Sequence, residues 1–497
     1  MENLVQDPRL VATNQLKENN SINSVVFQEH YPVTPITDNN QSQVEFVIPA
    51  NSNGLIDLKG SYIVNALSLT GQQGAGEVAG SWNQNDNIGF KENIGDTLWK
   101  DVKIFINGVE VQDNHPNLYC QSAFYKRVLD DQGINGTSTL MNAPRQTSVA
   151  TLSTVLTNPH ARYSGWKGVE GLDLAGEGEG GNYTVVSGTQ SISSLPSHRI
   201  YDIYRRWRGG TDKQNPLEVI TKLQDGIFNQ PFFLPPNCDI RILLTKSNDA
   251  QTVYNNYTAS PSEMANIESS ILYVKRAYPI PSAMEMFNRS LALSPLVYNI
   301  KYTRTSQRSI PVGTSSIQET NLLNGVVPDR ILVAFVPTST VTGDYLRSPY
   351  ISSGNANESV NNNITSIYVN ANGRQYPQRQ YNLGVGIVGS RRANGARAYM
   401  DYVNTWAEDN DVFPQDSPPI TFDNWWSNYT FFVFDLRNDK LNENGYTTDL
   451  NNRGSIEVLA TQENLLGTIA GNTMIVMGIS HAKIFIDANR NVSKEGF

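Results

Sequence analysis

The chain has 497 residues, more than one small β-sandwich needs, so two domains are the default expectation. Its formal net charge of −9 argues against a protein that coats nucleic acid by charge alone. Charged residues make up only 17% of the sequence, and Asn, Gln, Ser, Thr and Tyr are abundant. This composition is typical of a polar β protein rich in turns and unlike that of a helical protein rich in Glu and Lys.

Cysteine content and hydropathy set further limits. The two cysteines, Cys120 and Cys238, are too few for a disulfide framework. Residues 1–20 lack the basic start and apolar core of a secretory signal, and they are expected to form a polar N-terminal arm. Because no stretch of about 18 apolar residues occurs, we expect no membrane-spanning helix.

Short strands dominate the first half of the chain. The predicted strands are Ser24–Phe27, Val44–Ile48, Ile56–Leu58, Tyr62–Val64, Val102–Ile106, Ile240–Leu244 and Ile271–Val274. The Gly-rich stretch Gly71–Asn87 is expected to be a loop. Residues 163–194 are dominated by Gly, Ser and Asn, which cannot build a core, so they are expected to form a long surface loop.

A helix is predicted at Pro116–Asp130, directly after the first strand hairpin. Cys120, Phe124 and Val128 recur at every fourth position and would share one face of that helix. Cys120 is then most simply a small core residue.

A second, shorter helix is predicted at the joint between two domains. Ser282–Glu285 has the pattern of a capping box and directly follows two prolines. Met284, Phe287 and Leu291 would then lie on one helical face. We therefore place a linker helix at residues 282–296.

The second half repeats this plan around one central strand. The run Arg330–Pro337 is almost wholly apolar and rich in β-formers, which predicts a strand buried on both faces. A helix is predicted at Tyr399–Trp406, after the second hairpin. Other strands are predicted at Tyr298–Thr303, Ile364–Val369, Tyr429–Phe434, Ile456–Leu459, Met474–Met477 and Lys483–Ile486.

Two segments of the first half recur in the same order in the second. Ile104–Gly108 (IFING) resembles Ile367–Gly373 (IYVNANG), each a strand followed by an Asn-Gly turn. Asp239–Thr245 resembles Ser455–Thr461. The long spacing indicates domain duplication rather than a solenoid. With many short strands and no βαβ alternation, we predict an all-β fold of two tandem eight-stranded jelly rolls (a double jelly roll) with short helices in loops.

One glycine pattern points to nucleotide binding but lacks its structural context. Gly384–Gly389 matches GxGxxG, and Asp409 follows at a suitable distance. A dinucleotide site requires a buried strand immediately before the first glycine. The preceding residues Gln375–Leu383 are polar and contain Pro377. We therefore interpret the pattern as a flexible loop.

No metal or catalytic motif is recognisable in the sequence. The histidines are His30, His115, His160, His198 and His481, and no two of them have metal-ligand spacing. Nucleophile elbows, phosphate loops and HExxH are also lacking. Asp435 and Asp487 flank strands, where capping a loop or pairing with it is the usual role. We predict no enzymatic activity, no catalytic, cofactor-binding or metal-binding residue and no cofactor, although a glycosidase carboxylate pair has no local spacing to recognise.

Two basic clusters and one aromatic stretch have alternative interpretations. Arg205–Arg208 interleaves charge with a tryptophan, as nucleic-acid surfaces do. A strand or loop edge bonded to neighbouring carboxylates is the favoured explanation for it and for Arg391-Arg392. Trp425-Trp426, close to Tyr429–Phe434, is explained by core packing at least as well as by a sugar-binding platform.

Several segments carry a family likeness. They are Leu98–Val111, Leu234–Leu244, the strand and helix before the joint, Pro328–Val336 with Gly343–Tyr345 and Pro349, Ile367–Asn370, Tyr429–Leu436 and Lys483–Val492. In this order they resemble the double jelly-roll major capsid (hexon) proteins of Polinton/Maverick elements, adintoviruses and related double-stranded DNA viruses. The likeness covers nearly the whole chain. It departs at 163–194, at Ser353–Asn363 and after Asn372-Gly373.

The resemblance implies a structural protein of the virion, made and assembled inside the host cell. Such proteins form homotrimers, whose six jelly rolls make a pseudo-hexagonal capsomer that tiles an icosahedral shell around double-stranded DNA. Expected partners are other copies of the chain, penton (single jelly-roll) proteins and minor capsid proteins. Little direct nucleic-acid binding is expected.

The expected layout is an arm at 1–20, jelly roll 1 at 21–281, the linker helix at 282–296 and jelly roll 2 at 297–497. The stretch Gly165–Ser194 is expected on the outer face of the capsomer. Its alternative is ordering by a neighbouring subunit or a minor shell protein, with Trp166 and Tyr183 as anchors.

Two competing functions stay open from the sequence. One is a carbohydrate-active or carbohydrate-binding protein built from two β-sandwiches, which would need a cleft with convergent carboxylates and exposed aromatics. The other is a host-domesticated capsid-like protein that no longer packages a genome.

Overall fold

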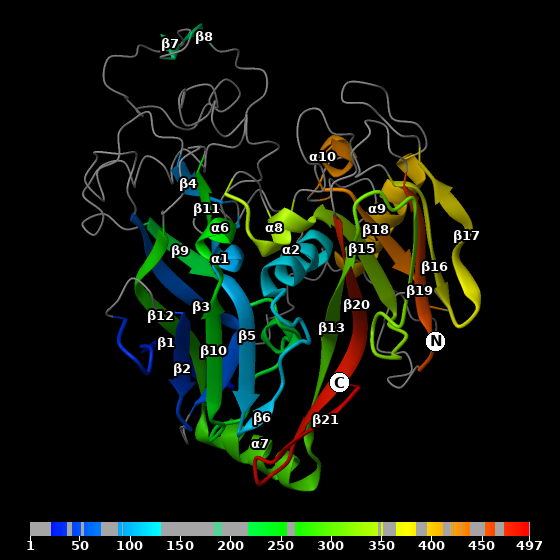
Figure 1. Cartoon of the computed structure of the whole chain (residues 1–497). Coiled ribbons are helices and arrows are strands. Elements are labelled where there is room, and N and C mark those ends of the chain that lie inside the picture. Colours follow the sequence, from blue (N-terminus) through cyan, green and yellow to red (C-terminus); the bar gives the residue numbers. More distant parts are fainter. Residues whose placement is uncertain are drawn as a thin grey trace, which may run out of the picture.

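A computed structural model gives the arrangement of the chain (Figure 1). It describes residues 21–36, 42–50, 54–70, 88–91, 93–130, 184–185, 188–189, 217–255, 264–345, 349–350, 364–383, 395–410, 418, 420, 422–427, 429–437, 453–462 and 472–496. The described strands form two β-sandwiches, each built from two antiparallel sheets.

The first jelly roll contains eight strands in two sheets, ordered β1-β12-β3-β9 and β2-β10-β5-β6. These strands are β1 (Ile22–His30), β2 (Gln43–Ile48), β3 (Leu55–Thr70), β5 (Trp99–Ile106), β6 (Val109–Glu110), β9 (Leu217–Thr221), β10 (Ile240–Lys246) and β12 (Met264–Pro279). Two small antiparallel pairs accompany them: β4 (Ile88–Phe90) with β11 (Val253–Asn255), and β7 (Thr184–Val185) with β8 (Gly188–Thr189).

The second jelly roll has the sheets β13-β20-β15-β18 and β14-β19-β16-β17, with β21 added to β20. Its strands are β13 (Leu296–Ile310), β14 (Ser316–Thr320), β15 (Arg330–Pro337), β16 (Ile364–Ala371), β17 (Arg374–Asn382), β18 (Phe431–Asp435), β19 (Ile456–Gln462), β20 (Asn472–Ile486) and β21 (Val492–Glu495). All eight residues of β15 are buried, which confirms the prediction for this central strand.

The two sheet orders are the same once each strand is matched to its duplicate. β13, β20, β15 and β18 take the places of β1, β12, β3 and β9, and β14, β19, β16 and β17 those of β2, β10, β5 and β6. The two sequence echoes therefore fall on equivalent strands, β5 with β16 and β10 with β19. The predicted double jelly roll is confirmed.

Short helices connect or cover the sandwiches. They are α1 (Ile94–Thr97), α2 (Tyr119–Asp130), α5 (Gly226–Asn229), α6 (Asp249–Thr252), α7 (Pro281–Leu293), α8 (Thr338–Thr342), α9 (Ala396–Asn410) and α10 (Phe422–Ser427). The helices α2 and α9 follow equivalent hairpins, as predicted. Helix α7 lies at the base of the molecule and joins the two rolls (Figure 1).

Several predicted boundaries were wrong in detail. Ile56–Leu58 and Tyr62–Val64 belong to one long strand, β3, and Met474–Met477 and Lys483–Ile486 to another, β20. Long strands with short polar interruptions give two separate apolar signals in the sequence. The helix predicted from Pro116 starts at Tyr119.

The prediction of a capping box at the joint was also wrong. Ile280 is the N-cap of α7 and makes no side-chain cap bond, and Pro281 occupies the first turn. Proline fixes φ near the helical value and has no N–H to satisfy, so it can begin a helix without a Ser cap. Glu285 instead pairs with Arg289, 2.9 Å away on the helix surface.

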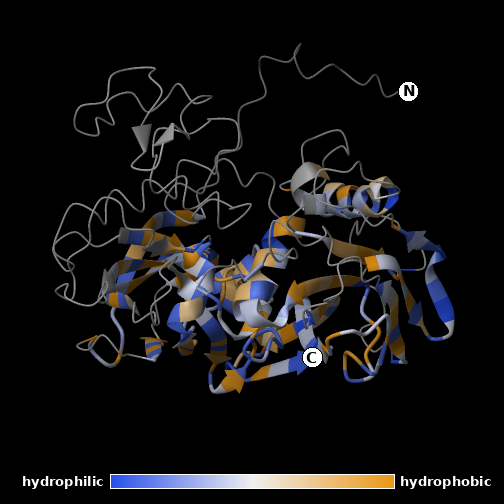
Figure 2. Cartoon of the chain, turned by 45° about the horizontal axis from the view of Figure 1, so that its top comes forward, coloured by the Kyte–Doolittle hydropathy of each residue, from blue (hydrophilic) through white to orange (hydrophobic). Residues whose placement is uncertain are grey.

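The polar stretch before the glycine pattern forms strand β17, which the sequence did not predict. It lies at the edge of its sheet and pairs only with β16. Figure 2 shows its mainly hydrophilic colouring at the right of the view. An edge strand needs no apolar alternation and tolerates Pro377, which explains the missed prediction.

Candidate functional site: the buried junction between the two jelly rolls

Helix α2 belongs to the first roll by sequence but is packed into the core of the second. Eleven of its twelve residues are buried. Phe124, Tyr125 and Val128 lie in the second roll's hydrophobic core. The ring of Phe124 stacks on Tyr350 with centroids 4.2 Å apart. The apolar face predicted from the sequence therefore exists, but it joins two domains.

Strand β13 makes the reciprocal contact, from the second roll into the first. Its residues Tyr298, Ile300 and Tyr302 are buried in the first roll's core. The edge of β13 also pairs with the segment after β6. Asn114 N–H donates to the Thr303 carbonyl at 2.9 Å, and Thr305 N–H donates to the Asn114 carbonyl at 2.7 Å. Each roll therefore buries part of its apolar surface in the core of the other roll.

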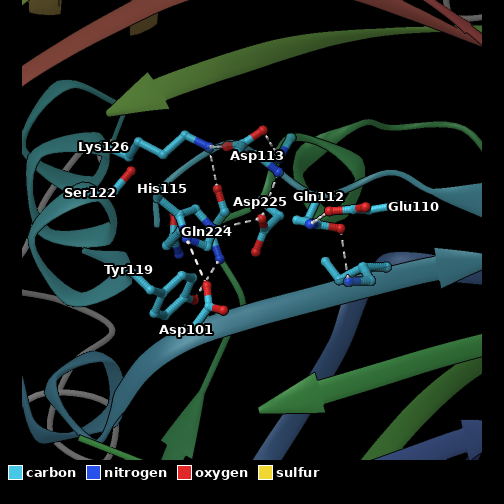
Figure 3. Close-up of polar contacts among 12 residues, drawn as sticks. Asp101, Glu110, Gln112, Asp113, His115, Tyr119, Ser122, Lys126, Gln224 and Asp225 are labelled. Atoms are coloured by element: carbon cyan, nitrogen blue, oxygen red, sulfur yellow. Dashed lines mark hydrogen bonds and ion pairs between the residues drawn. The ribbon is translucent and has the colours of Figure 1, made fainter. Parts of the chain in front are cut away.

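Between these contacts lies a cluster of buried charges (Figure 3). His115 Nε2 lies 3.3 Å from Asp225 Oδ1, and His115 Nδ1 lies 3.6 Å from Asp101 Oδ1. Burial alone would lower the pKa of His115, but the two carboxylates outweigh it and raise that pKa to about 9. The imidazole is therefore a cation at neutral pH.

Lys126 extends this cluster from α2. Its Nζ forms an ion pair with Asp113 and donates to the carbonyl of Gln224. The N–H of Asp113 donates to Asp225 Oδ1 at 3.0 Å, which links the two ion pairs. Burial raises the pKa of Asp113, and the neighbouring Lys126 opposes that shift. Buried charges arranged in this way hold each other in place and fix the position of α2.

A polar cavity of about 540 Å³ opens beside the cluster. Its lining comes from both rolls: Asp101, Lys103, Glu110, Gln112, Asp113, Asn114, His115, Pro116, Asn117, Tyr302 and Lys494. Because the two carboxylates raise the pKa of His115 and favour its protonated form, the imidazole is a poor general base at neutral pH. Within the described residues, no group of three or more His, Cys, Asp and Glu side chains is arranged to hold a metal ion. The chemistry at the junction is that of a structural ion-pair network.

The histidines, the glycine pattern and the basic clusters singled out in the sequence do not come together in the described structure. His30 lies at the end of β1, His115 pairs with Asp225 at the junction, and His481 on β20 pairs with Asp329. His160 and His198 fall outside the described residues. So do Gly384–Gly389, Arg205–Arg208, Arg391-Arg392 and most of 163–194.

Two roles expected for carboxylates beside strands agree with the structure. Asp435 pairs with Arg437 at 2.8 Å, and Asp487 Oδ1 accepts from the Asn491 N–H at 2.8 Å.

Trp425 and Trp426 are fully buried in the second core. Their burial supports core packing and removes them as a sugar-binding platform.

The sequence did not indicate that Asp101, Asp113, His115 and Asp225 would come together. Asp225 lies 110 residues from His115 along the chain and comes beside it only through folding. A lone His after a hairpin carries no spacing signal, so no local pattern could have found this cluster.

None of the helices in the described part of the chain has the length and apolar character that a membrane crossing requires.

The geometry defines a double jelly roll, and comparisons with known proteins agree. Neither a protein-family model nor a curated protein sequence matches the chain. Solved structures match over nearly its whole length. A chain of the Sputnik virophage, solved by cryo-EM, has a TM-score of 0.54 at 12% identity, covering 99% of this chain and 92% of that one.

Two further matches are to proteins described as viral capsid components. The mavirus major capsid protein has a TM-score of 0.51 at 11% identity, covering 99% of this chain and 95% of that one. The Faustovirus major capsid protein has a TM-score of 0.52 at 10% identity, covering 96% and 92%. At these identities the likeness establishes the shared fold, the double jelly roll of these capsid proteins.

Proposed function

We propose that this chain is a viral major capsid protein that forms a homotrimeric, pseudo-hexagonal capsomer. Such capsomers would tile an icosahedral shell around a double-stranded DNA genome. The observation that carries the proposal is the full-length match of a duplicated jelly roll to capsid proteins that have the same two-roll arrangement. Two equivalent rolls per chain give a trimer six similar wedges, which suits hexagonal packing.

We divide the chain into domains according to the same proposal. Residues 1–20 would be an arm, 21–281 and 297–497 the two rolls, and 282–296 the linker. The sheets support this division, since each described sheet consists of strands from one side of α7 alone.

The proposed role is structural, without catalysis, cofactor or bound metal. Its partners would be other copies, neighbouring capsomers, penton proteins and minor capsid proteins, with little direct contact to DNA. The acidic net charge of −9 supports weak DNA contact. Residence in the virion shell, after assembly in the host cell, follows from this role.

Light scattering on purified protein tests the proposal. A homotrimer should have about three times the chain mass of 55.1 kDa at micromolar concentration. Negative-stain images should show hexagonal particles or plates. A monomer across a wide concentration range would contradict the proposal, and so would strong binding to a glycan array.

A further inference from the structure

Arg276 on β12 is a buried cation without a hydrogen-bond partner. Only 1% of the residue is exposed, and none of the described residues accepts a hydrogen bond from Nε, Nη1 or Nη2 of its guanidinium. A buried charge of this kind destabilises a fold unless something compensates it. Unpaired buried groups in native proteins therefore indicate a bound ion, a water or a functional role. The guanidinium of Arg276 is thus available to bind an anion.

A second unpaired nitrogen lies on the neighbouring strand. His30, the last residue of β1, is 8% exposed, and its Nε2 has no partner among the described residues. In the antiparallel pairing of β1 with β12, Val26 is opposite Arg276 and His30 is opposite Leu272. Because successive residues of a strand alternate between its faces, Arg276 and His30 lie on the same face as the core residue Leu272. The charge of Arg276 acts on the His30 ring, and both groups belong to one pocket of the sheet.

The carboxylates of the surrounding strands have other partners. On β1, β2, β3 and β12 the described pairs are Glu29 with Tyr31, Glu45 with Arg241, Asp57 with Lys275, and Glu268 with Ser68. Glu29 and Lys275 stand next to His30 and Arg276 in sequence and therefore lie on the opposite face of the sheet. The described part of these four strands supplies no carboxylate to Arg276, so its counter-ion has to come from outside them.

The site can be reached from solvent along β1. This strand is at the edge of its sheet and pairs only with β12, beside it in Figure 1. Every residue from Asn23 to Glu29 is exposed, and Val26, directly opposite Arg276, is 51% exposed. Segments with few buried contacts open locally at a low free energy. A small ion can therefore reach Arg276 beneath β1, whereas a bulky molecule cannot.

We propose that Arg276 and His30 form a binding site for a small tetrahedral oxyanion, such as sulfate or inorganic phosphate. The planar guanidinium fork binds two oxygens of such an ion. A third oxygen accepts a hydrogen bond from the protonated His30 Nε2. A carboxylate has only two oxygens, and the fork alone occupies both, so the tetrahedral ion fits this pair of donors better. The inference goes beyond the proposed capsid function and does not depend on the trimer.

Oxyanion binding should bring a proton to His30. Burial and the charge of Arg276 lower the pKa of His30, and a hydrogen bond to the Val47 backbone offsets them only in part. The ring of the empty site is therefore neutral at neutral pH. A bound anion compensates the charge of Arg276 and accepts from Nε2–H, which favours the protonated ring. By linkage, binding should weaken as the pH rises from about 5 to 8.

Titration calorimetry with sulfate tests the site on the full-length chain, with chloride holding the ionic strength constant. Sulfate is the suitable probe because its own charge does not change in this pH range. Wild type should bind one sulfate per chain, and Arg276→Met should bind it at least about tenfold more weakly. Arg289→Met is the matched control, since Arg289 is an exposed arginine on α7 that pairs with Glu285, and it should bind like wild type.

His30→Gln separates the contribution of the imidazole. This variant should bind sulfate with an affinity that no longer depends on pH, because it has no titrating group at position 30. An affinity of wild type that does not change with pH would overturn the role of His30 as the second donor. Circular dichroism of each variant should show native folding before the titrations are compared.

Three results would overturn the site as a whole. One is equal sulfate affinity in wild type and Arg276→Met, and another is the lack of saturable binding by wild type. The third is binding of a short double-stranded DNA that depends on Arg276 and displaces sulfate, which would assign the guanidinium to a backbone phosphate instead of a free ion. The mass of the particle is measured separately, so failure of the oxyanion site leaves the proposed function standing.

Discussion

Asn107 and Asn372 form the same pair of hydrogen bonds at equivalent turns of the two jelly rolls. Asn107 N–H donates to the carbonyl of Asp239 at 2.8 Å, and its Oδ1 accepts from the Asp239 N–H at 2.7 Å. Asn372 makes the same two bonds to Ser455, at 3.0 and 3.1 Å. Each asparagine thus links a hairpin turn to the start of a neighbouring strand.

Both asparagines also have left-handed backbone conformations, with φ of 48° for Asn107 and 51° for Asn372. Asparagine tolerates this region better than most residues, and its side chain can accept a backbone N–H. The residue type therefore meets two requirements at once, which explains why the same Asn-Gly turn stands in both halves.

Replacement of either asparagine by alanine should destabilise the protein by about 1–3 kcal/mol, from the strained φ and the lost acceptor. Thermal unfolding would measure the effect as a lower Tm. Asn372→Asp keeps the acceptor oxygen and should therefore lose little stability. Asn107→Asp should lose more, because the Asn107 side-chain amide donates to the Arg490 carbonyl at 2.7 Å. Equal losses for the two aspartate variants would contradict this explanation.

Some of the fold could be predicted because its signals are local. The buried run at Arg330–Pro337 and the Asn-Gly turns are read from a few consecutive residues. The duplication followed from comparing two such signals in order. Contacts between distant segments could not be predicted: nothing near Phe124 indicates that its apolar face enters the second roll, and Asp225 reaches His115 only through the fold.

The stability of the junction should depend on pH through His115. Its pKa is about 9 in the folded chain and near 6.5 when unfolded, so its stabilising contribution is complete below about pH 6.5. That contribution is lost as the pH rises through 9. Between pH 6.5 and 9.5, the free energy of unfolding should fall by up to about 3 kcal/mol more in wild type than in His115→Gln.

Tm values measured across this range would test the prediction, since the variant has no titrating group at position 115. Identical pH profiles for wild type and His115→Gln would show that Asp101 and Asp225 do not hold a proton on the imidazole.

Arg276 is expected to cost stability. It is buried on the inner face of β12, and no described residue accepts a hydrogen bond from its guanidinium nitrogens. Burial lowers its pKa. Because a buried charge without a partner is unfavourable, Arg276→Met should raise the free energy of unfolding by about 1–4 kcal/mol.

Arg304→Met provides the contrasting variant. Arg304 is also buried, but its Nη2 donates to the Gly496 carbonyl at 3.1 Å and its guanidinium lies 4.7 Å from the centroid of the Tyr302 ring. Its replacement should lower Tm. A lower Tm for Arg276→Met as well would indicate that the first guanidinium gains a partner in solution.

The stack of Phe124 on Tyr350 should decide whether the two rolls unfold together. Phe124 belongs to the first roll's helix, yet its ring is buried in the second core, so Phe124→Ala would remove a large apolar side chain shared by both domains. We expect a loss of about 3–5 kcal/mol. Because the lost contact joins the domains, calorimetry should show two transitions in the variant and one in wild type.

Tyr350→Phe is the matched control for this substitution. It keeps the stacked ring and removes only the hydroxyl, which shares a 2.6 Å hydrogen bond with Thr97 Oγ1 across the junction. This variant should lose about 1 kcal/mol and retain a single transition. If Phe124→Ala also unfolds in one transition, the two rolls must be coupled mainly through the β13 contact and the buried ion pairs. If Tyr350→Phe unfolds in two, the hydrogen bond contributes more to the coupling than the packing of the aromatic rings.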